Sequence, residues 1–345
     1  MTAEKKKSKA KRVLLIILIL FLSLAIALAG TFFALHTIGK KQFHKDDRNI
    51  QIDAPADDIE IDENSVTYNG SKYTLDPNVV SVLFMGIDKD DISSDKGYGK
   101  NGQADAVFVA AFNTKDKSIK IIPIPRETMV DVNLYTKDGE YSGTQREQIC
   151  LAYAYGDTAE NCSNNVLTSV RRVLYGINIT SYVTMDLNGV KAVTDAIGGI
   201  SLPCLETFDL DGKVYTQGQQ LKLDGYLARY YIQFRGSDEH ASERRMLRQK
   251  QFLTAFADTA GNQIMNNFTK LGTYYNLLQP YVSTNLSFSQ ITYLASSCLI
   301  MNVGSSLDYK AVSGNISVGE KYVEFIPDRN SLLDTIMDVF YEKIE

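Results

Sequence analysis

Acidic residues and arginines stand beside three short apolar segments of this chain. Asp88 directly follows the apolar run 79–87, Asp105 directly precedes the run 106–112, and Arg126 follows the run 120–124. Later in the chain come further candidates for ligand contacts, namely Arg235, Arg245, Arg248 and Gln249. Carboxylate oxygens hold Mg²⁺, and guanidinium groups bind phosphate oxygens in pairs. The combination is therefore typical of metal-assisted phosphoryl chemistry.

Each of these residues also has an ordinary structural explanation. An acid beside a strand often caps a loop, and arginines on a helix often lie on its solvated face. Arg245 and Gln249 are four residues apart, so on a helix they share one face and can contact the same ligand. The order and spacing of the whole set therefore carry more information than any single residue.

Charge and composition exclude several classes of function. Residues 1–41 carry eight Lys and Arg against one Glu, a charge of +7, and the whole chain is at -5, so the other 304 residues sum to -12. An acidic body argues against general nucleic-acid binding, which needs a basic surface. With 3 His in 345 residues, the composition argues against histidine-based catalysis or metal binding. The sequence also contains no G-x-S-x-G, H-E-x-x-H or G-x-x-x-x-G-K-[ST] motif.

Strands interleaved with helices are predicted around these residues. The apolar runs predict strands over 79–87, 106–112, 120–124, 182–187 and 321–326. Helical spacing predicts helices over 163–175, 188–197, 244–260 and from about 331, the second ending at Gly198 and Gly199. This alternation predicts a layered α/β fold over residues 79–345.

A long apolar segment lies near the N-terminus. Residues 13–35 form a run of 23 uncharged residues, long enough for a helix that crosses about 30 Å of hydrocarbon. The basic tail 1–12 precedes it, so we expect the tail in the cytoplasm and the body outside the cell membrane. A cleaved signal peptide is the alternative, but the run continues past Ala29 and exceeds the usual signal-peptide core. We therefore favour a single-pass anchor.

Two further predictions follow from this placement. The polar segment 36–78 is expected to be an extracytoplasmic stalk, with a small hairpin around Asn69 and Gly70. Cysteines outside the cytoplasm can form disulfides. If any pair forms, we expect it to join Cys150 and Cys162, which are 12 residues apart. Four free thiols are the alternative.

Six sequence blocks, in order, resemble those of a known family. They are Leu83–Asp88, Ala104–Ala106, Ile122–Val130, Ala152–Gly156, Ala196–Ile200, and Arg235 together with Arg245–Gln249. In these blocks the chain from about 80 to 255 resembles the LytR-CpsA-Psr family of Gram-positive cell-wall proteins. The resemblance implies an α/β/α domain with a central mixed sheet and an apolar channel for a polyprenyl chain. Apolar residues within 163–200 have a spacing that suits such a channel or a plain core.

The resemblance also implies a function. Family members are phosphotransferases that use Mg²⁺ to attach a polyprenyl-pyrophosphate-linked anionic glycopolymer to peptidoglycan, and a pyrophosphatase side activity is a further option. By resemblance, Asp88 and Asp105 hold the metal and are catalytic together with Arg126. The residues expected to bind substrate are Arg126, Arg235, Arg245, Arg248 and Gln249. The alternative is a non-catalytic polyprenyl-pyrophosphate-binding or attenuator protein of the cell envelope.

Four positions depart from the family pattern. Gln103 and Gln233 stand where arginines are usual, Glu127 replaces an aspartate, and Cys150 replaces an asparagine. Each lost guanidinium removes a charge-assisted contact worth about 1.5–3 kcal/mol to a phosphate. Metal and pyrophosphate binding are therefore more secure predictions than full-rate transfer.

Overall fold

The computed structural model describes residues 29–43, 59–62, 65–93, 97–236, 241–298, 307–319 and 322–344. The chain divides into two compact units, one made of Met1–Asp47 with Ser287–Ser296 and one made of the remainder. The predicted tail 1–12 and most of the predicted anchor 13–35 lie outside the described residues. No helix in the described part has both the length and the apolar character needed to cross a membrane.

The first unit pairs two helical segments. Residues 29–43 are helical, and α7 (Phe288–Cys298) contributes its first nine residues to the same unit. Gly39 permits a close approach, because a Cβ atom there would lie 2.1 Å from the carbonyl oxygen of Ser289. The rings of His36 and Tyr293 meet edge to face, with centroids 5.1 Å apart.

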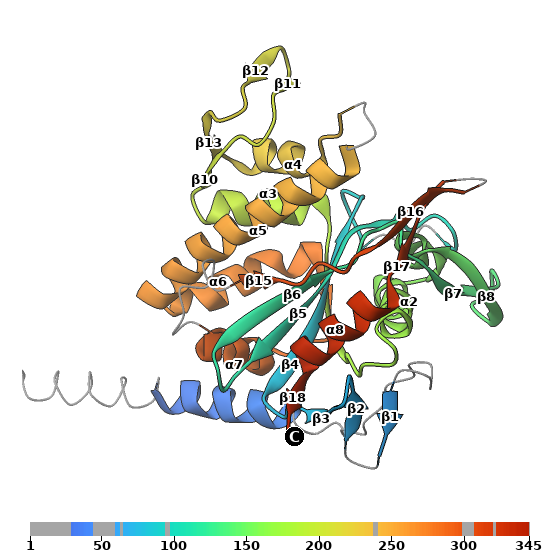
Figure 1. Cartoon of the computed structure of the whole chain (residues 1–345). Coiled ribbons are helices and arrows are strands. Elements are labelled where there is room, and N and C mark those ends of the chain that lie inside the picture. The colour runs from blue at the N-terminus through green and yellow to red at the C-terminus, as the bar shows by residue number, and fades with distance from the viewer. Residues whose placement is uncertain are drawn as a thin grey trace, which may run out of the picture. The chain divides into compact units, whose positions relative to one another are not determined.

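A mixed six-stranded sheet forms the centre of the second unit (Figure 1). In spatial order its strands are β14 (Val282–Thr284), β9 (Ser181–Met185), β4 (Val79–Ile87), β5 (Ala104–Asn113), β6 (Ser118–Pro123) and β15 (Leu307–Tyr309). The pairs β4–β9 and β6–β15 are parallel, and the other three pairs are antiparallel. The predicted α/β fold with a central mixed sheet is confirmed.

One face of this sheet packs against two helices. Leu83 and Val109 of the sheet share a buried core with Val166 of α2 (Ala159–Val173) and Ile336 of α8 (Arg329–Phe340). Most apolar residues of α2 are buried here, Val173 is only partly buried, and Ile197, after α3 (Leu187–Ala196), lies in a second core. Most of the apolar residues of 163–200 are therefore core residues, which favours a plain core over a channel for this segment.

The opposite face of the sheet is less completely covered. Ala110, Ile119 and Ile121 are buried there, whereas Phe84 and Phe108 stay partly exposed and stack with ring centroids 5.2 Å apart. Helix α5 (Ala241–Asn266) reaches the edge strand of this face, where the ammonium of Lys250 lies 4.3 Å from the ring of Tyr309. Partly exposed aromatic residues thus gather on this face rather than along α2.

The second core joins α5 to a group of short elements. These are β10 (Ile200–Pro203), β11 (Phe208–Leu210), β12 (Lys213–Tyr215), β13 (Gln220–Leu223), α4 (Gly225–Gln233) and α6 (Thr269–Leu278), which η2 (Gln279–Tyr281) follows. Gly198 and Gly199 end α3 with φ of 83° and 87°, a region that glycine adopts without strain, as the sequence predicts.

A separate four-stranded sheet differs from the stalk expected over 36–78. Its order is β1 (Ile59–Ile61), β2 (Val66–Tyr68), β3 (Ser71–Leu75) and the C-terminal β18 (Tyr341–Lys343). Asn69 and Gly70 have φ of 48° and 72°, so the predicted hairpin turn is confirmed. Because Val66 and Tyr68 are buried in the main core, the described residues of 59–75 belong to the folded body.

Two hairpins complete the described body. The first joins β7 (Met129–Tyr135) to β8 (Tyr141–Gln148), which leads into the 3-10 helix η1 (Ile149–Tyr155). The second joins β16 (Gly314–Val318) to β17 (Val323–Pro327). Phe325 donates its backbone N–H to the carbonyl of Glu127 at 2.9 Å, so the second hairpin meets the chain directly after Arg126.

Candidate functional site

Strand order brings Asp88, Asp105 and Arg126 to one end of the sheet. β4 ends at Ile87 and pairs with the antiparallel β5, whose first residue Ala104 lies opposite Ile87. β6 is also antiparallel to β5 and ends at Pro123, three residues before Arg126. The end of β4, the start of β5 and the end of β6 therefore lie at the same edge, as the positions of these residues in the sequence suggest.

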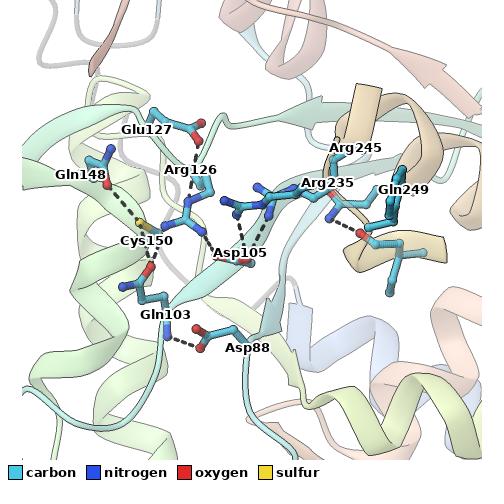
Figure 2. A network of polar contacts seen from close by, with 12 residues as sticks. Asp88, Gln103, Asp105, Arg126, Glu127, Gln148, Cys150, Arg235, Arg245 and Gln249 are labelled. Atoms are coloured by element: carbon cyan, nitrogen blue, oxygen red, sulfur yellow. Dashed lines mark hydrogen bonds and ion pairs between the residues drawn. The ribbon is translucent and has the colours of Figure 1, made fainter. Parts of the chain in front are cut away.

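Asp105 is the centre of the site, because three guanidinium groups contact it (Figure 2). Arg126 Nη1 contacts Oδ1, while Arg235 Nη2 and Arg245 Nη1 lie 3.3 and 3.0 Å from Oδ2. Arg126 reaches the carboxylate from one side and the other two arginines from the opposite side. Glu127 Oε1 lies 3.7 Å from Arg126 Nε, so three cations face two anions. The cluster has a net positive charge within an acidic body.

The two innermost arginines differ in their electrostatic setting. Burial acts to lower the pKa of Arg126, but the neighbouring Cys150, Asp105 and Glu127 outweigh it, so its pKa is raised. The pKa of Arg245 is lowered, mainly by burial and also by the nearby Arg235 and Arg126. Arg245 is 3% exposed, and its Nε has no hydrogen-bond partner among the described residues. This buried donor therefore leaves a hydrogen bond unmade beside Asp105.

Asp88 lies beside the cluster and is held by the backbone. Its Oδ1 accepts the N–H of Gln103 at 2.6 Å, and its own N–H donates to the carbonyl of Gln103 at 3.1 Å. The described residues contain no group of three or more His, Cys, Asp and Glu side chains that could hold a metal. Mg²⁺ is commonly bound through one or two carboxylates plus substrate phosphates and water, and the assignment of Asp88 and Asp105 to such a site stays a prediction.

Arg248 and Gln249 occupy structural positions and do not reach Asp105. Arg248 is fully buried: its Nε donates to the carbonyl of Tyr231 at 2.9 Å, and its other nitrogens contact the carbonyl of Phe234 and the carboxylate of Glu206. Gln249 Nε2 donates to the carbonyl of Ile232 at 3.3 Å. These carbonyls belong to the C-terminal end of α4, just before Arg235. The substrate-binding roles expected of both residues therefore have no support in these contacts, and Glu206 is a site-supporting residue that the sequence did not indicate.

The two glutamines that stand where the family usually has arginines make different contacts. Gln103 Oε1 accepts a hydrogen bond of 2.6 Å from Arg126 Nη2, so this side chain orients the central arginine. Gln233 is exposed, and its Oε1 accepts from Arg229 at 3.2 Å, away from the cluster. Only the first of these substitutions, therefore, changes the immediate contacts of Arg126.

The predicted disulfide between Cys150 and Cys162 is wrong, because both are buried free thiols, as is Cys204. Cys150 Sγ points at Gln103 and Gln148, at 4.0 and 3.7 Å from their Oε1 atoms, whereas Cys162 packs against the backbone of Gly156. Burial raises the pKa of Cys150 to about 11, although Arg126 opposes this, and Cys150 is a neutral thiol at pH 7. The side chain of Cys298 lies outside the described residues.

Comparison with known sequences places similar proteins in one family. A sequence model of the LytR_cpsA_psr family matches residues 40–335. The chain is 27% identical over 242 residues to the polyisoprenyl-teichoic acid–peptidoglycan teichoic acid transferase TagU of Enterococcus faecalis. This alignment covers 68% of this chain and 67% of that protein. It is 29% identical over 218 residues to the corresponding transferase TagV of Bacillus subtilis, covering 61% of this chain and 50% of that protein. The match thus spans between one half and two thirds of these relatives.

Solved structures share the fold. The crystal structure of B. subtilis TagV superposes with a TM-score of 0.60 at 25% identity, covering 76% of this chain and 96% of that chain. The protein gbs0355 from Streptococcus agalactiae superposes with a TM-score of 0.63 at 17% identity, covering 76% of this chain and 86% of that chain. The central mixed sheet is therefore a shared feature of this chain and these proteins.

Proposed function

Because the chain belongs to the LytR_cpsA_psr family, we propose that it is a phosphotransferase that moves an anionic glycopolymer from a polyprenyl pyrophosphate carrier to peptidoglycan. The contact of three arginines with Asp105 is the observation that carries this proposal. Two relatives are named as transferases of teichoic acid to peptidoglycan, and teichoic acid is the kind of donor polymer that such an arginine cluster suits. A membrane anchor at 13–35, with the body outside, would place the site where both substrates are found.

The arginines act on the pyrophosphate of the donor. Guanidinium groups bind phosphate oxygens bidentately, and Arg126, Arg235 and Arg245 approach one point from two sides. The diphosphate competes with Asp105 for these donors and also finds the unpaired Nε of Arg245. Binding therefore releases the carboxylate of Asp105 into the site while phosphate takes its place. The partly exposed aromatic residues on the neighbouring sheet face, such as Phe84 and Phe108, suit the apolar polyprenyl chain.

The reaction transfers one phosphoryl group. An oxygen of an acceptor sugar hydroxyl attacks the phosphorus that carries the glycopolymer, and the bond from that phosphorus to the bridging oxygen breaks. Polyprenyl monophosphate leaves with that oxygen, and Asp105 or Asp88 accepts the hydroxyl proton. Arg126 stabilises the charge that develops on the phosphoryl oxygens. Mg²⁺, which Asp88 and Asp105 would hold, supplies further charge neutralisation.

A donor analogue with a short polyprenyl chain and soluble peptidoglycan fragments test this proposal. We expect Arg126→Ala to lower turnover about 10²-fold or more, as removal of one preorganised charge stabiliser does in other enzymes. Asp105→Ala should abolish metal-dependent turnover and also lower the thermal transition, because the buried Arg245 then lacks its carboxylate. Arg146→Ala is the matched control, because this exposed arginine of β8 pairs only loosely, at 4.0 Å, with Asp131. Unchanged turnover in both site variants would contradict the assignment.

The alternative is a protein that holds a polyprenyl pyrophosphate without turnover. It is favoured by Gln103, which stands where the family usually has an arginine and whose side-chain amide oxygen accepts a hydrogen bond from Arg126. The same assay separates the two functions. A binding protein would retain the donor analogue, lose it in Arg126→Ala, and release no polyprenyl monophosphate with any metal or acceptor. Product release above the rate of Asp105→Ala would exclude this alternative.

A further inference from the structure

Three tyrosines gather at the outer end of the β7–β8 hairpin, which is the green hairpin at the right of Figure 1. The rings of Tyr98 and Tyr135 stack with centroids 6.2 Å apart, and Tyr141 meets Tyr135 edge to face at 6.1 Å. The hydroxyl of Tyr98 lies against the hairpin turn, because a Cβ atom on Gly139 would be 2.8 Å from it. Two separate segments therefore build one aromatic surface.

This tyrosine surface is accessible to a large ligand. Tyr141 is 61% exposed, and Tyr98 and Tyr135 are half-buried. Asn133 adds an amide beside the rings, 3.5 Å from the hydroxyl of Tyr135. Exposed aromatic rings with hydroxyl and amide groups at their edges combine an apolar face with hydrogen-bonding groups, which is the chemistry of a binding surface rather than of a core.

Both segments that carry the tyrosines also lead to the charged site. The loop 97–103 runs from Tyr98 to Gln103, which donates to Asp88 and accepts from Arg126. β7 begins three residues after Arg126 and ends at Tyr135. The six residue steps of β7 span about 20 Å at the usual rise of an extended strand. A ligand that touches both the far end of β7 and the arginine cluster is therefore expected to be extended.

We propose that Tyr98, Tyr135 and Tyr141 form a glycan-binding surface that holds the acceptor strand of peptidoglycan while one of its sugar hydroxyls lies at the arginine cluster. The inference rests on the proposed transferase function. The C–H groups on one face of a pyranose ring pack against an aromatic face, and the sugar hydroxyl and acetamido groups hydrogen-bond to the phenol and amide groups at the edge. Tyrosine offers such contacts at a low cost in conformational entropy.

The charge of the hairpin favours the acceptor over the anionic donor polymer. Residues 129–148 contain four acids (Asp131, Asp138, Glu140 and Glu147) and two bases (Lys137 and Arg146), a sum of -2. A polymer with one phosphate in every repeat would meet this net negative charge and only scattered cations, such as Arg146 and Arg172, in place of a cluster of arginines. The uncharged sugar rings of a glycan strand avoid this repulsion. The tyrosine surface and the arginine cluster thus suit the two different substrates.

Binding of the full chain in detergent to purified peptidoglycan sacculi, stripped of attached glycopolymers, tests the proposal. We expect Tyr141→Ala to weaken binding about fivefold and Tyr135→Ala/Tyr141→Ala to weaken it further, since aromatic contacts of this kind contribute about a factor of 2 to 10 each. Tyr141→Phe keeps the ring and should bind within about twofold of the unchanged protein. Tyr226→Ala is the matched control, because Tyr226 is 54% exposed on α4.

Measurements with donor-like ligands show whether the tyrosines bind the acceptor glycan or the donor polymer. Short poly(glycerol phosphate) should bind equally to all tyrosine variants, and turnover of a polyprenyl pyrophosphate to water, without acceptor, should stay unchanged in them. Sacculus binding that is unaltered in the double variant overturns the proposal, as does a loss of poly(glycerol phosphate) binding instead. If the unchanged chain turns over no donor but still binds sacculi through the tyrosines, the transferase function fails while the glycan surface is supported.

Discussion

At the scale of single residues, Asp105 and a bound diphosphate compete for the same guanidinium groups. Both oxygens of Asp105 contact arginines, so the carboxylate holds the three cations together. Like charges this close would otherwise repel one another. A carboxylate in the middle therefore preorganises the arginines for phosphate.

Two substitutions test which family departures matter at this scale. Gln103→Arg should tighten binding of inorganic pyrophosphate about tenfold, because the new guanidinium lies beside Arg126 and adds a charge-assisted contact. Gln233→Arg should change that affinity less than about twofold, because position 233 is exposed and faces Arg229. Isothermal titration of both variants measures the two effects. The reverse order of effects would show that the contacts of Gln233 differ in the ligand-bound protein.

Sequence reasoning was strongest for residues that end or begin a strand. Asp88, Asp105 and Arg126 could be grouped because antiparallel neighbours bring such residues to one edge, and the structure does place Arg126 on Asp105. Arg248 and Gln249 were harder to interpret, because the helical spacing shows which residues share a face but not what that face meets. Arg248 meets the end of α4 and Glu206, a contact between segments 42 positions apart in the sequence. No local pattern encodes that pairing.

At the scale of elements, the end of α4 depends on a buried charged clamp. Arg248 donates to the carbonyls of Tyr231 and Phe234 and pairs with Glu206, so it fixes the backbone that leads to Arg235. Burial lowers the pKa of Arg248 to about 10, and it stays protonated at neutral pH. Arg248 is thus a positioning residue for Arg235 rather than a contact of the substrate.

Substitution of either partner in this clamp should affect stability and donor affinity together. We expect Arg248→Met to lower the free energy of unfolding by about 1–3 kcal/mol, because the carbonyls of Tyr231 and Phe234 lose their donor, while Glu206 keeps its second ion pair with Arg244. The double change Glu206→Leu/Arg248→Met should be less stable still, since Arg244 then also loses its contact with Glu206. Both variants should raise the Michaelis constant for the donor, since Arg235 has lost its support. Chemical denaturation and steady-state kinetics of both variants measure this. An unchanged Michaelis constant in both variants would contradict the positioning role.

The N-terminus of α3 carries an acid that should make stability depend on pH. Asp186 caps this helix through a 2.7 Å bond from Gly189 N–H to Oδ1, while Oδ2 is buried and has no hydrogen-bond partner among the described residues. Burial raises its pKa to about 6, with a further contribution from Asp91. Between about pH 4 and pH 6 the folded protein therefore binds more protons than the unfolded chain, and ionisation of Asp186 costs stability as the pH rises.

Asp186→Asn should remove this cost while keeping the helix cap. Relative to the unchanged protein, the free energy of unfolding of the variant should rise by about 1–3 kcal/mol between pH 4 and pH 7. Urea unfolding at several pH values measures the difference. Asp328→Asn is the control, because Asp328 caps α8 in the same way but is exposed. Parallel pH profiles for all three proteins would refute the assignment.

Elements were predictable where one periodic pattern covered their whole length. The strand over 79–87 and the helix after 187 agree with β4 and α3 to within a residue. For 59–75 the sequence did not show a place in the folded body, because a polar segment looks the same whether it is free or forms an edge sheet, and its partner β18 lies at the other end of the chain. The sequence likewise could not show that Cys150 faces Gln103 and Gln148, which excludes the short disulfide.

At the scale of the whole molecule, the N-terminal segment and the body of the chain carry opposite net charges. The chain beyond residue 41 has a formal charge of -12, and the first 41 residues have +7. An acidic body repels anionic polymers except at a local cationic cluster, so the arginines around Asp105 are where a pyrophosphate gains most. A basic tail suits the anionic inner face of a membrane instead. The two charge distributions therefore point to opposite sides of a bilayer.

This division of charge predicts the topology of the chain. The apolar run 13–35 with its lysine-rich flank should form a single uncleaved anchor, with the body outside the cell. Protease added to intact protoplasts should degrade the chain beyond about residue 40 and leave a short membrane-bound stub. A signal peptidase product that starts after the alanines at 25–29 would instead indicate a cleaved leader. A full-length chain protected from protease until the membrane is broken would reverse the topology, and would separate the proposed site from the peptidoglycan it is expected to modify.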